Sequence, residues 1–280
     1  NIGGGYDGRK VSFYSNLAGI GNNYFADMGW IPFAEHYDAI RDTSFHIGFQ
    51  HLFSRFSYTF YPSNQDRIVS HELRTQHILD VNNDLELLQN QITIAYSLRL
   101  NNTAAFSIEY KHEDQALQYP FDFTEEEPLP AGRYHFDYVK AGYQSDWRNF
   151  FGWWSTWLYG NFYNGTRFEL SLGGRYRVQP WGKFGVNFTY NKLDFPSPYG
   201  TEDLLLIGPR IEFNFSKDLF WTTFLQYNTQ DDNFNINSRL QWRFQPLSDL
   251  FIVYSDNYAV ETWGPKNRTL VLKLNYWLNL

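Results

Sequence analysis

RTLVLKLNYWLNL, residues 268–280, closes the chain with alternating side chains. One set of alternate positions is apolar: Leu270, Leu272, Leu274, Tyr276, Leu278 and Leu280. The other set is mostly polar: Val271, Lys273, Asn275, Trp277 and Asn279. Successive side chains of a β-strand point to opposite faces, so this stretch predicts a strand with one apolar and one mostly polar face. Such a strand suits a transmembrane β-barrel between lipid and water, but it also suits the edge of a soluble β-sandwich.

The same alternation recurs along the chain, most clearly in 166–178 and 234–245. It predicts about fourteen strands: 9–20, 43–61, 68–80, 85–100, 103–112, 134–145, 150–162, 166–178, 183–193, 204–215, 219–228, 234–245, 250–255 and 268–280. Many are roughly ten residues or longer, whereas strands of soluble domains are usually about five or six. A tilted strand needs about ten residues to cross a bilayer. The pattern therefore favours an all-β fold, an antiparallel outer-membrane β-barrel, over a soluble sandwich, propeller or lectin. Residues 1–280 would form one barrel domain, or the C-terminal part of a larger barrel.

Three local predictions accompany this pattern. The glycines from Gly3 to Gly5 and Gly8 predict a flexible entry. A change of apolar parity within 43–61 predicts a β-bulge near Ser54 or Arg55. The stretch 113–132, with prolines and an acidic run, predicts a long loop.

Short connections alternate with longer ones along the chain. The short set is 101–102, 146–149, 178–182, 216–218 and 245–249; the alternate set includes the longer 113–133, 194–203 and 256–267, although 164–165 and 229–233 are short. Outer-membrane barrels have short periplasmic turns and longer extracellular loops. The alternation thus predicts a bacterial outer-membrane location with a periplasmic C-terminus. Aromatic residues near the short-turn rim would form an interfacial belt: Trp221, Trp242, Tyr276 and Trp277.

Composition fits this prediction. Aromatic residues make up 20% of the chain, yet the mean hydropathy is −0.50. A lipid-facing aromatic coat around a hydrated lumen combines both features, and so does a carbohydrate-binding protein that stacks rings on sugars. There is no cysteine and no apolar run near the roughly 18 residues of a membrane helix. The net charge of −7 argues against nucleic acid as a partner. Asn1 opens without a leader, which predicts a mature exported chain or a fragment.

Charged side chains on the polar parity are candidate lumen-lining groups: Arg167, Glu169, Arg175, Arg177, Arg210, Glu212, Arg239 and Arg243. Charges inside a barrel can pair with one another or reach water. One interpretation is a cationic lining that selects an anionic solute. The other, which we favour, is a structural ion network that fills the barrel or holds a plug.

No catalytic, cofactor or metal signature is recognisable. The histidines all lie in the first half of the chain, without a serine in a recognisable nucleophile context. His46 and His51 would lie on opposite faces of one strand, and His71 and His77 far apart along another. Carboxylates of the predicted acidic loop could bind calcium, although a solvated loop is the simpler interpretation: Glu113, Asp114, Asp122, Glu125, Glu126 and Glu127. We therefore expect neither an enzyme nor a cofactor.

Three stretches, together with the closing strand, carry a resemblance: PAGRYHFDYVKAGYQSD (130–146), NFYNGTRFELSLGGRYR (161–177) and INSRLQWRFQPLSDLFIVYSD (236–256). They resemble the C-terminal β-barrel of a Bacteroidota outer-membrane family of unassigned function, whose longer members carry an N-terminal domain similar to family-9 carbohydrate-binding modules. The resemblance runs from about Asn22 onward. It implies a barrel scaffold and carries over no functional residues. The chain departs from the family in lacking that N-terminal domain, in a shorter barrel region, and in ending on Leu280 where an aromatic residue is common.

We therefore expect a barrel that passes or captures a solute, or that serves as the membrane subunit of a cell-envelope complex. Its partners would be outer-membrane lipid or lipopolysaccharide, with other envelope proteins or glycans as further candidates. The alternative is a soluble, secreted carbohydrate-binding β protein. A hydrolase built on a barrel is a third, weaker hypothesis.

Overall fold

The computed structural model describes residues 1–24, 34–64, 66–230, 232–260, 262 and 264–278. They form 17 strands: β1 (Ile2–Asp7), β2 (Val11–Ile20), β3 (Glu35–Asp38), β4 (Thr43–His46), β5 (Phe49–Phe60), β6 (Ile68–Asn82), β7 (Leu87–Leu100), β8 (Ala105–Leu117), β9 (Gly132–Gln144), β10 (Phe151–Phe162), β11 (Gly165–Val178), β12 (Gly182–Asp194), β13 (Thr201–Asn214), β14 (Leu219–Asn228), β15 (Asn233–Gln245), β16 (Ser248–Ala259) and β17 (Gly264–Asn275). No helix in this part of the chain is long and apolar enough to span a membrane.

Fifteen strands form one sheet in the order β1-β2-β5-β6-β7-β8-β9-β10-β11-β12-β13-β14-β15-β16-β17, and β3 and β4 form a separate two-stranded sheet. Strands that follow one another in the large sheet are hydrogen-bonded neighbours and antiparallel. This confirms the predicted all-β, antiparallel class. The order begins at β1 and ends at β17, and the sheet is not closed by any pairing between described residues.

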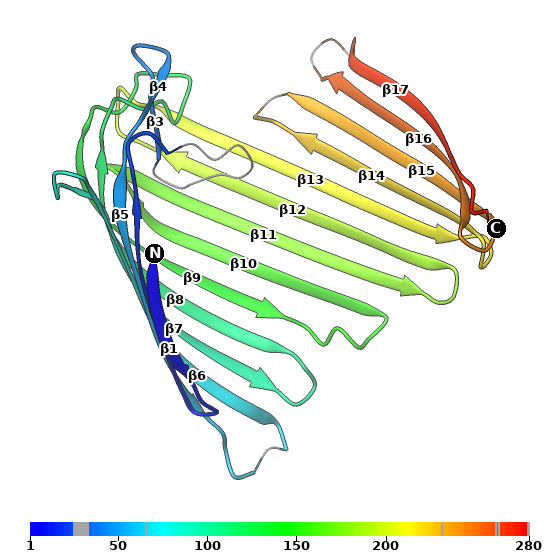
Figure 1. Cartoon of the computed structure of the whole chain (residues 1–280), viewed down its shortest axis with the longest axis horizontal. Helices are drawn as coiled ribbons and strands as arrows, with labels where there is room; N and C mark the ends of the chain where they lie inside the picture. Colours follow the sequence, from blue (N-terminus) through cyan, green and yellow to red (C-terminus); the bar gives the residue numbers. More distant parts are fainter. Residues whose placement is uncertain (25–33, 65, 231, 261, 263, 279–280) are drawn as a thin grey trace. The chain divides into compact units, whose positions relative to one another are not determined.

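The chain divides into two compact units. Unit 1 contains residues 1–143, 157–169 and 192–202; unit 2 contains 144–156, 170–191 and 203–280. In unit 1, β5 to β8 lie side by side with short turns between them (Figure 1). In unit 2, the strands from β14 to β17 form an antiparallel meander (Figure 1).

The N-terminal half differs from the sequence prediction in two places. The glycine-rich entry forms β1, which pairs with β2 over Ile2–Asp7 because a strand partner supplies hydrogen bonds whatever the side chains are. The predicted strand 43–61 is two strands: β4 pairs with β3, and β5 pairs with β2 and β6. Registers run without interruption past Ser54 and Arg55, so the predicted β-bulge there is wrong. Phe49 and Phe53 lie on one face of β5 and Phe56, Tyr58 and Phe60 on the other, so the apolar parity changes within a regularly paired strand.

Other strands run beyond their predicted ends. β8 continues to Leu117 and takes Glu113 and Asp114 out of the predicted acidic loop. β16 extends to Ala259, and β17 begins at Gly264, so the predicted long connection 256–267 is short. β17 ends at Asn275, whereas the prediction carried this strand to Leu280; residues 279 and 280 lie outside the described part. Polar residues near strand ends still form backbone hydrogen bonds with neighbouring strands. The hydrophobic pattern alone therefore does not predict where a strand ends.

The two faces of the strands have unusual exposure. On β7 the side chains of Ile92, Ile94 and Tyr96 are 41%, 46% and 41% exposed. The alternate side chains of Gln89 and Thr93 are 6% and 3% exposed. Soluble proteins usually bury apolar side chains and expose polar ones, so the burial here is inverted.

The inversion extends over neighbouring strands. In unit 1 the exposed apolar positions are cross-strand neighbours and form what we call the apolar face: Phe56, Tyr58, Leu73, Ile92, Ile94, Tyr96, Phe106, Ile108 and Tyr110. The opposite, polar face carries Arg74, Gln76, Gln89, Gln91, Thr93, Glu109, Lys111 and Glu113. In unit 2, Leu270, Leu272 and Leu274 of the closing strand are 71%, 70% and 63% exposed, and the alternate residues of this last strand of the sheet are exposed as well. The predicted alternation of this strand is confirmed by its register with Tyr254, Ile252 and Leu250.

Candidate functional site

Most of the predicted lumen charges are paired with neighbouring side chains. In unit 1, the Arg167 Nη2 lies 2.6 Å from Glu169 Oε2 on the same face of β11. In unit 2, Glu212 lies between two cations, 2.7 Å from Arg210 Nε and 3.1 Å from Lys183 Nζ. Arg167 and Glu169 are two residues apart on β11, and Arg210 and Glu212 are two residues apart on β13, so alternation places each of these two pairs on one face. Such pairs neutralise the charges within the sheet, so little net charge remains to attract a dissolved ion.

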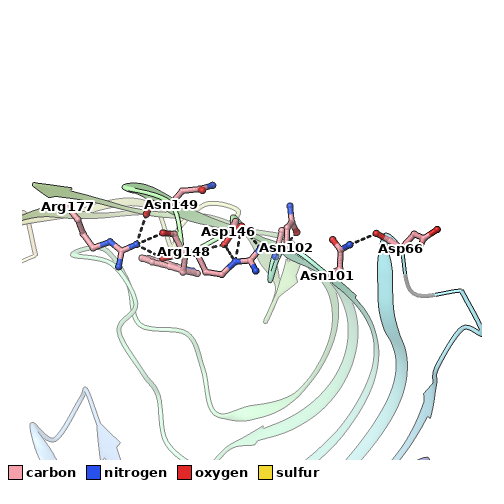
Figure 2. Close-up of polar contacts among 9 residues, drawn as sticks. Asp66, Asn101, Asn102, Asp146, Arg148, Asn149 and Arg177 are labelled. Carbon is pink, nitrogen blue, oxygen red and sulfur yellow. Dashed lines mark hydrogen bonds and ion pairs between the residues drawn. The ribbon is translucent and has the colours of Figure 1, made fainter. Parts of the chain in front are cut away.

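Arg175 and Arg177 hold the turn between β9 and β10. Arg177 Nη2 donates to the carbonyl oxygens of Trp147, Arg148 and Asn149 at 3.1, 2.6 and 2.8 Å (Figure 2). Arg175 also donates to the Trp147 carbonyl, and its guanidinium lies 4.3 Å from the centre of the Trp147 ring. A planar guanidinium with several N–H donors suits this use. These two arginines therefore organise a turn.

Another turn at the ends of strands has a similar arrangement in unit 1. The side-chain amide of Asn101 donates to the carbonyl oxygen of Asp66, which ties the β7–β8 turn to the β5–β6 connection (Figure 2). The backbone N–H of Asn101 donates to the carbonyl of Arg67 at 3.0 Å. These contacts are local and structural.

The last two predicted charges behave differently from each other. Arg243 lies 3.3 Å from Asp249 on the register partner strand. Arg239 faces Thr222 and Val253 in the register and has no ion pair with any side chain in the part of the chain that the structure describes. The set of eight therefore contains several local pairs, two turn-binding arginines and one arginine for which the described residues supply no carboxylate partner.

Sequence reasoning missed the partners of these charges. Lys183 and Asp249 complete the pairs of unit 2, and Arg74 with Glu109 makes a further pair of 3.5 Å in unit 1. Lys183, Arg74 and Glu109 lie on polar parities of predicted strands, so the same alternation rule could have identified them, whereas Asp249 lies in the predicted connection 245–249. Which of them would meet across neighbouring strands depends on register, and the sequence does not specify it.

The histidines form contacts that the sequence did not predict. His46 and His51 belong to different strands, β4 and β5, so the prediction that they share one strand is wrong. His51 Nδ1 lies 2.6 Å from Asp80 Oδ1, which is almost fully buried on the polar face.

A second histidine network lies on the apolar-face parity, toward the end of β8 and the start of β9, near the long connections. His112 Nδ1 lies 2.8 Å from Asp137 Oδ1, and His135 contacts Asp114. The Asn90 side-chain amide donates to Asp114 at 3.0 Å. Each histidine here contacts a carboxylate, so a polar network lies where the apolar face ends.

The predicted calcium loop does not assemble. Glu113 accepts a hydrogen bond from Gln89 at 2.9 Å on the polar face of β8, whereas its neighbour Asp114 bonds Asn90 on the other face. Successive residues of a strand cannot direct their carboxylates at one cation. Within the described residues, no group of three or more acidic, histidine or cysteine side chains has an arrangement suited to a metal ion.

Unit 1 contains a cavity of about 270 Å³ near the long connections. Its walls come from β3, from the end of β8 with the segment after it, and from the β10–β11 turn. The lining residues are Glu35, His36, Tyr37, Gln115, Leu117, Gln118, Tyr119, Phe121, Phe123 and Tyr163. Hereafter we call this cavity the aromatic pocket.

Local contacts explain why this pocket forms. The backbone N–H of Ala39 donates to the carbonyl of Pro120 at 2.9 Å, which fixes the β3–β4 hairpin against the segment after β8. Phe121 and Leu129 exchange two backbone hydrogen bonds of 3.0 and 2.9 Å. Leu129 is nearly fully buried and belongs to a small core with Leu193 and Phe195. The polar backbone of the segment is thereby satisfied while its rings face one another.

The rings of the pocket form a continuous aromatic cluster. Phe123 lies 4.7 Å from Phe121 and 4.7 Å from Tyr163, measured between ring centres. Tyr37 meets Phe121 edge to face at 6.2 Å, and these separations are usual for attractive ring pairs. Burial raises the pKa of Tyr163, so its phenol stays neutral.

The surroundings of the pocket are acidic. The connections of unit 1 at this end carry Glu35, Asp38, Asp42, Asp84, Glu86, Asp122, Glu125, Glu126 and Glu127. Arg41 is the one arginine or lysine among the described residues of these connections, and Asp38 already holds it at 3.1 Å. A hydrogen bond to Asp42 raises the pKa of the Tyr37 phenol.

No protein-family model matches the chain, and a search of curated proteins finds no match.

Proposed function

We propose that this protein is an integral outer-membrane β-barrel of a Gram-negative bacterium, from the Bacteroidota family that its sequence resembles, and that it captures or passes a small solute. In this proposal the apolar face of the sheet meets lipid and the polar face lines a hydrated lumen. The C-terminus lies in the periplasm, and the long connections reach the cell exterior.

The observation that carries the proposal is the inverted exposure of alternate side chains. Exposing Ile92, Ile94 and Tyr96 to water while burying Gln89 and Thr93 would be costly in a soluble protein. Each of these nearly half-exposed apolar side chains forgoes about 1 kcal/mol of burial. Lipid removes that cost, and each strand of the large sheet from β2 to β16 has a hydrogen-bonded neighbour on both sides.

The edge of the apolar face supports the same location. Tyr110 donates its hydroxyl to the carboxylate of Asp137 where that face ends, and in unit 2 the hydroxyl of Tyr254 reaches Asp256. An aromatic ring with a polar tip is typical of the boundary between hydrocarbon and headgroups. Trp242, predicted to lie in such a belt, is 50% exposed on the lipid parity of unit 2.

The paired charges favour the structural interpretation of the polar face. Because Arg167, Arg210 and Arg243 have carboxylate neighbours, they strengthen the wall more than they select an anion. Solute capture is therefore better assigned to the aromatic pocket than to these arginines.

Membrane fractionation tests the location. The protein should remain in the membrane pellet through a high-salt wash and dissolve only with detergent. Release into buffer would overturn the proposal and favour the alternative, a soluble secreted carbohydrate-binding protein.

Cysteine labelling tests the assignment of the faces, since the native chain has no cysteine. In intact membranes, Ile94→Cys should resist a charged maleimide and react with a lipid-soluble one. Ile40→Cys is the matched control, because Ile40 is 74% exposed between β3 and β4 and should react with both. Equal reaction of both variants with the charged reagent would contradict a lipid-facing apolar face.

A further inference from the structure

We propose that the aromatic pocket binds a small organic cation, an ammonium group that carries a short apolar body. This inference deepens the proposed solute capture and rests on it for the compartment that supplies the ligand. The binding chemistry itself follows from the shape, rings and charge of the pocket.

The size of the pocket sets the size of the ligand. At about 270 Å³ it lies just below the range of about 300–1,000 Å³ that drug-sized ligands occupy. Its walls are mostly rings, from Tyr37, Phe121 and Phe123 among others, with carboxylate, imidazole and amide groups beside them. A small molecule with one charged group and a compact apolar body matches this division.

Aromatic walls attract a cation through their negative ring faces. Tyr37 donates its hydroxyl to Asp42 at 2.9 Å, which leaves its ring richer in electrons. Rings that meet edge to face, such as Tyr37 and Phe121 at 87°, present faces in different directions around a small volume. Such an arrangement suits the rounded shape of an alkylammonium group.

The charge of the pocket selects the sign of the ligand. Glu35 lines the pocket, is exposed, and has no ion pair with a described residue. The described residues that line the pocket include no lysine or arginine, and carboxylates predominate in the connections around it. Because carboxylates outnumber basic groups there, the local field favours a cation over an anion.

The chain already uses this chemistry on the same hairpin. The guanidinium of Arg41 lies 5.7 Å from the centre of the Phe45 ring, and Phe45 stacks on Tyr119 at 4.6 Å. Tyr119 in turn lines the pocket. A ligand cation in the pocket would contact Tyr119 and so extend the stack formed by Arg41, Phe45 and Tyr119.

Ligand-observed NMR with the full chain in detergent micelles tests the proposal. The main probe is choline, compared with glucose and with the uncharged isostere of choline in which a tert-butyl group replaces the trimethylammonium group. Choline should bind about tenfold more tightly than the isostere, as expected for a cation that is partly desolvated against rings. Equal binding of choline and its isostere, or tighter binding of glucose than of choline, would overturn the proposal.

Two variants and one matched control locate the binding. Tyr119→Ala and the conservative Glu35→Gln should each weaken choline binding several-fold, and Glu35→Gln should leave binding of the isostere unchanged. The control is Tyr61→Ala, which removes a ring at the other end of unit 1 where Arg9 lies 5.0 Å from the ring centre. Choline binding that survives both pocket variants would also overturn the proposal.

Failure of this experiment can be separated from failure of the proposed function. The binding assay is carried out in detergent and does not depend on where the protein resides in the cell. Membrane fractionation gives the location independently. A membrane-bound protein that does not prefer choline would refute the ligand assignment alone.

Discussion

The hydroxyl of Tyr110 on β8 donates a hydrogen bond of 2.6 Å to the Asp137 carboxylate on β9, and His112 Nδ1 lies 2.8 Å from the same oxygen. Tyr110 continues the row of exposed Ile108 and Phe106, whereas His112 begins the polar network. The contact therefore marks where the apolar face of unit 1 ends. In unit 2, Tyr190 on β12 likewise donates to Asp203 on β13, whereas Tyr254 donates to Asp256 on its own strand, β16.

Tyr110→Phe should lower the free energy of unfolding by about 0.5–1.5 kcal/mol, because the ring remains and only the hydrogen bond is lost. Urea titration of the protein in lipid vesicles, followed by tryptophan fluorescence, measures the change. Tyr159→Phe is the control, since Tyr159 is 65% exposed and has no hydrogen bond to a described residue. Equal effects of both variants would show that the Asp137 contact adds nothing.

Ile94→Arg should lower the free energy of unfolding in vesicles by about 2–4 kcal/mol, the cost of a charge facing lipid near the middle of the bilayer. Ser97→Arg on the same strand is the matched control. Ser97 faces Glu72 in the β6–β7 register on the polar face, where a cation finds a partner. A soluble protein would tolerate the Ile94→Arg substitution well, so similar stability of both variants in vesicles would contradict the lipid-facing assignment.

Arg177→Ala should lower the free energy of unfolding by about 1–2 kcal/mol, because three carbonyls of the β9–β10 turn lose a charged donor. Arg177→Lys should recover only part of the loss, since an ammonium cannot reproduce the planar fork. Arg239→Ala removes an arginine of equal charge that has no ion-pair partner among the described residues, and it should change stability little. If Arg239→Ala were as harmful as Arg177→Ala, general charge on the polar face would matter more than the turn.

Gly173→Ala should destabilise unit 2 by about 1–3 kcal/mol, as overpacking does. An added Cβ would lie 2.1 Å from Nε1 of Trp154, so the indole would have to move. Adding Trp154→Leu to Gly173→Ala should recover part of the stability by removing the clash. Gly19→Ala is the control, because nothing lies within 4 Å of a Cβ at that position. Thermal unfolding measured by circular dichroism should show the largest loss for Gly173→Ala, a smaller one for the double variant and the smallest for Gly19→Ala.

Sequence patterns could predict much of the sheet. The parity of Leu270, Leu272 and Leu274 and the polar parity of Arg167 and Glu169 follow from the two-residue period of a strand, which is a local property. Strand ends were less predictable. β8 continues through Glu113 and Asp114 because each finds a hydrogen-bond partner on β7, and such partners are distant in sequence.

The site depended more on tertiary structure than the strands did. The eight predicted charges shared the right parity, but their partners, such as Lys183 for Glu212, depend on register between strands. The aromatic pocket joins Tyr37, Phe121 and Tyr163, which no local period relates. The positions of these aromatic side chains depend on contacts between segments that are far apart in the chain.

By itself the sequence determined that the chain is an antiparallel β protein with one apolar and one polar parity, because alternation is a property of neighbouring residues. Only the tertiary structure decided that β4 pairs with β3 and is separate from β5. It also decided that Glu113 and Asp114 belong to a strand and therefore point to opposite faces. Finally, it decided that the apolar parity of β7 in unit 1 is the more exposed one. The physical reason is that pairing and exposure depend on which distant segments cover each face, and a periodic pattern carries no such information.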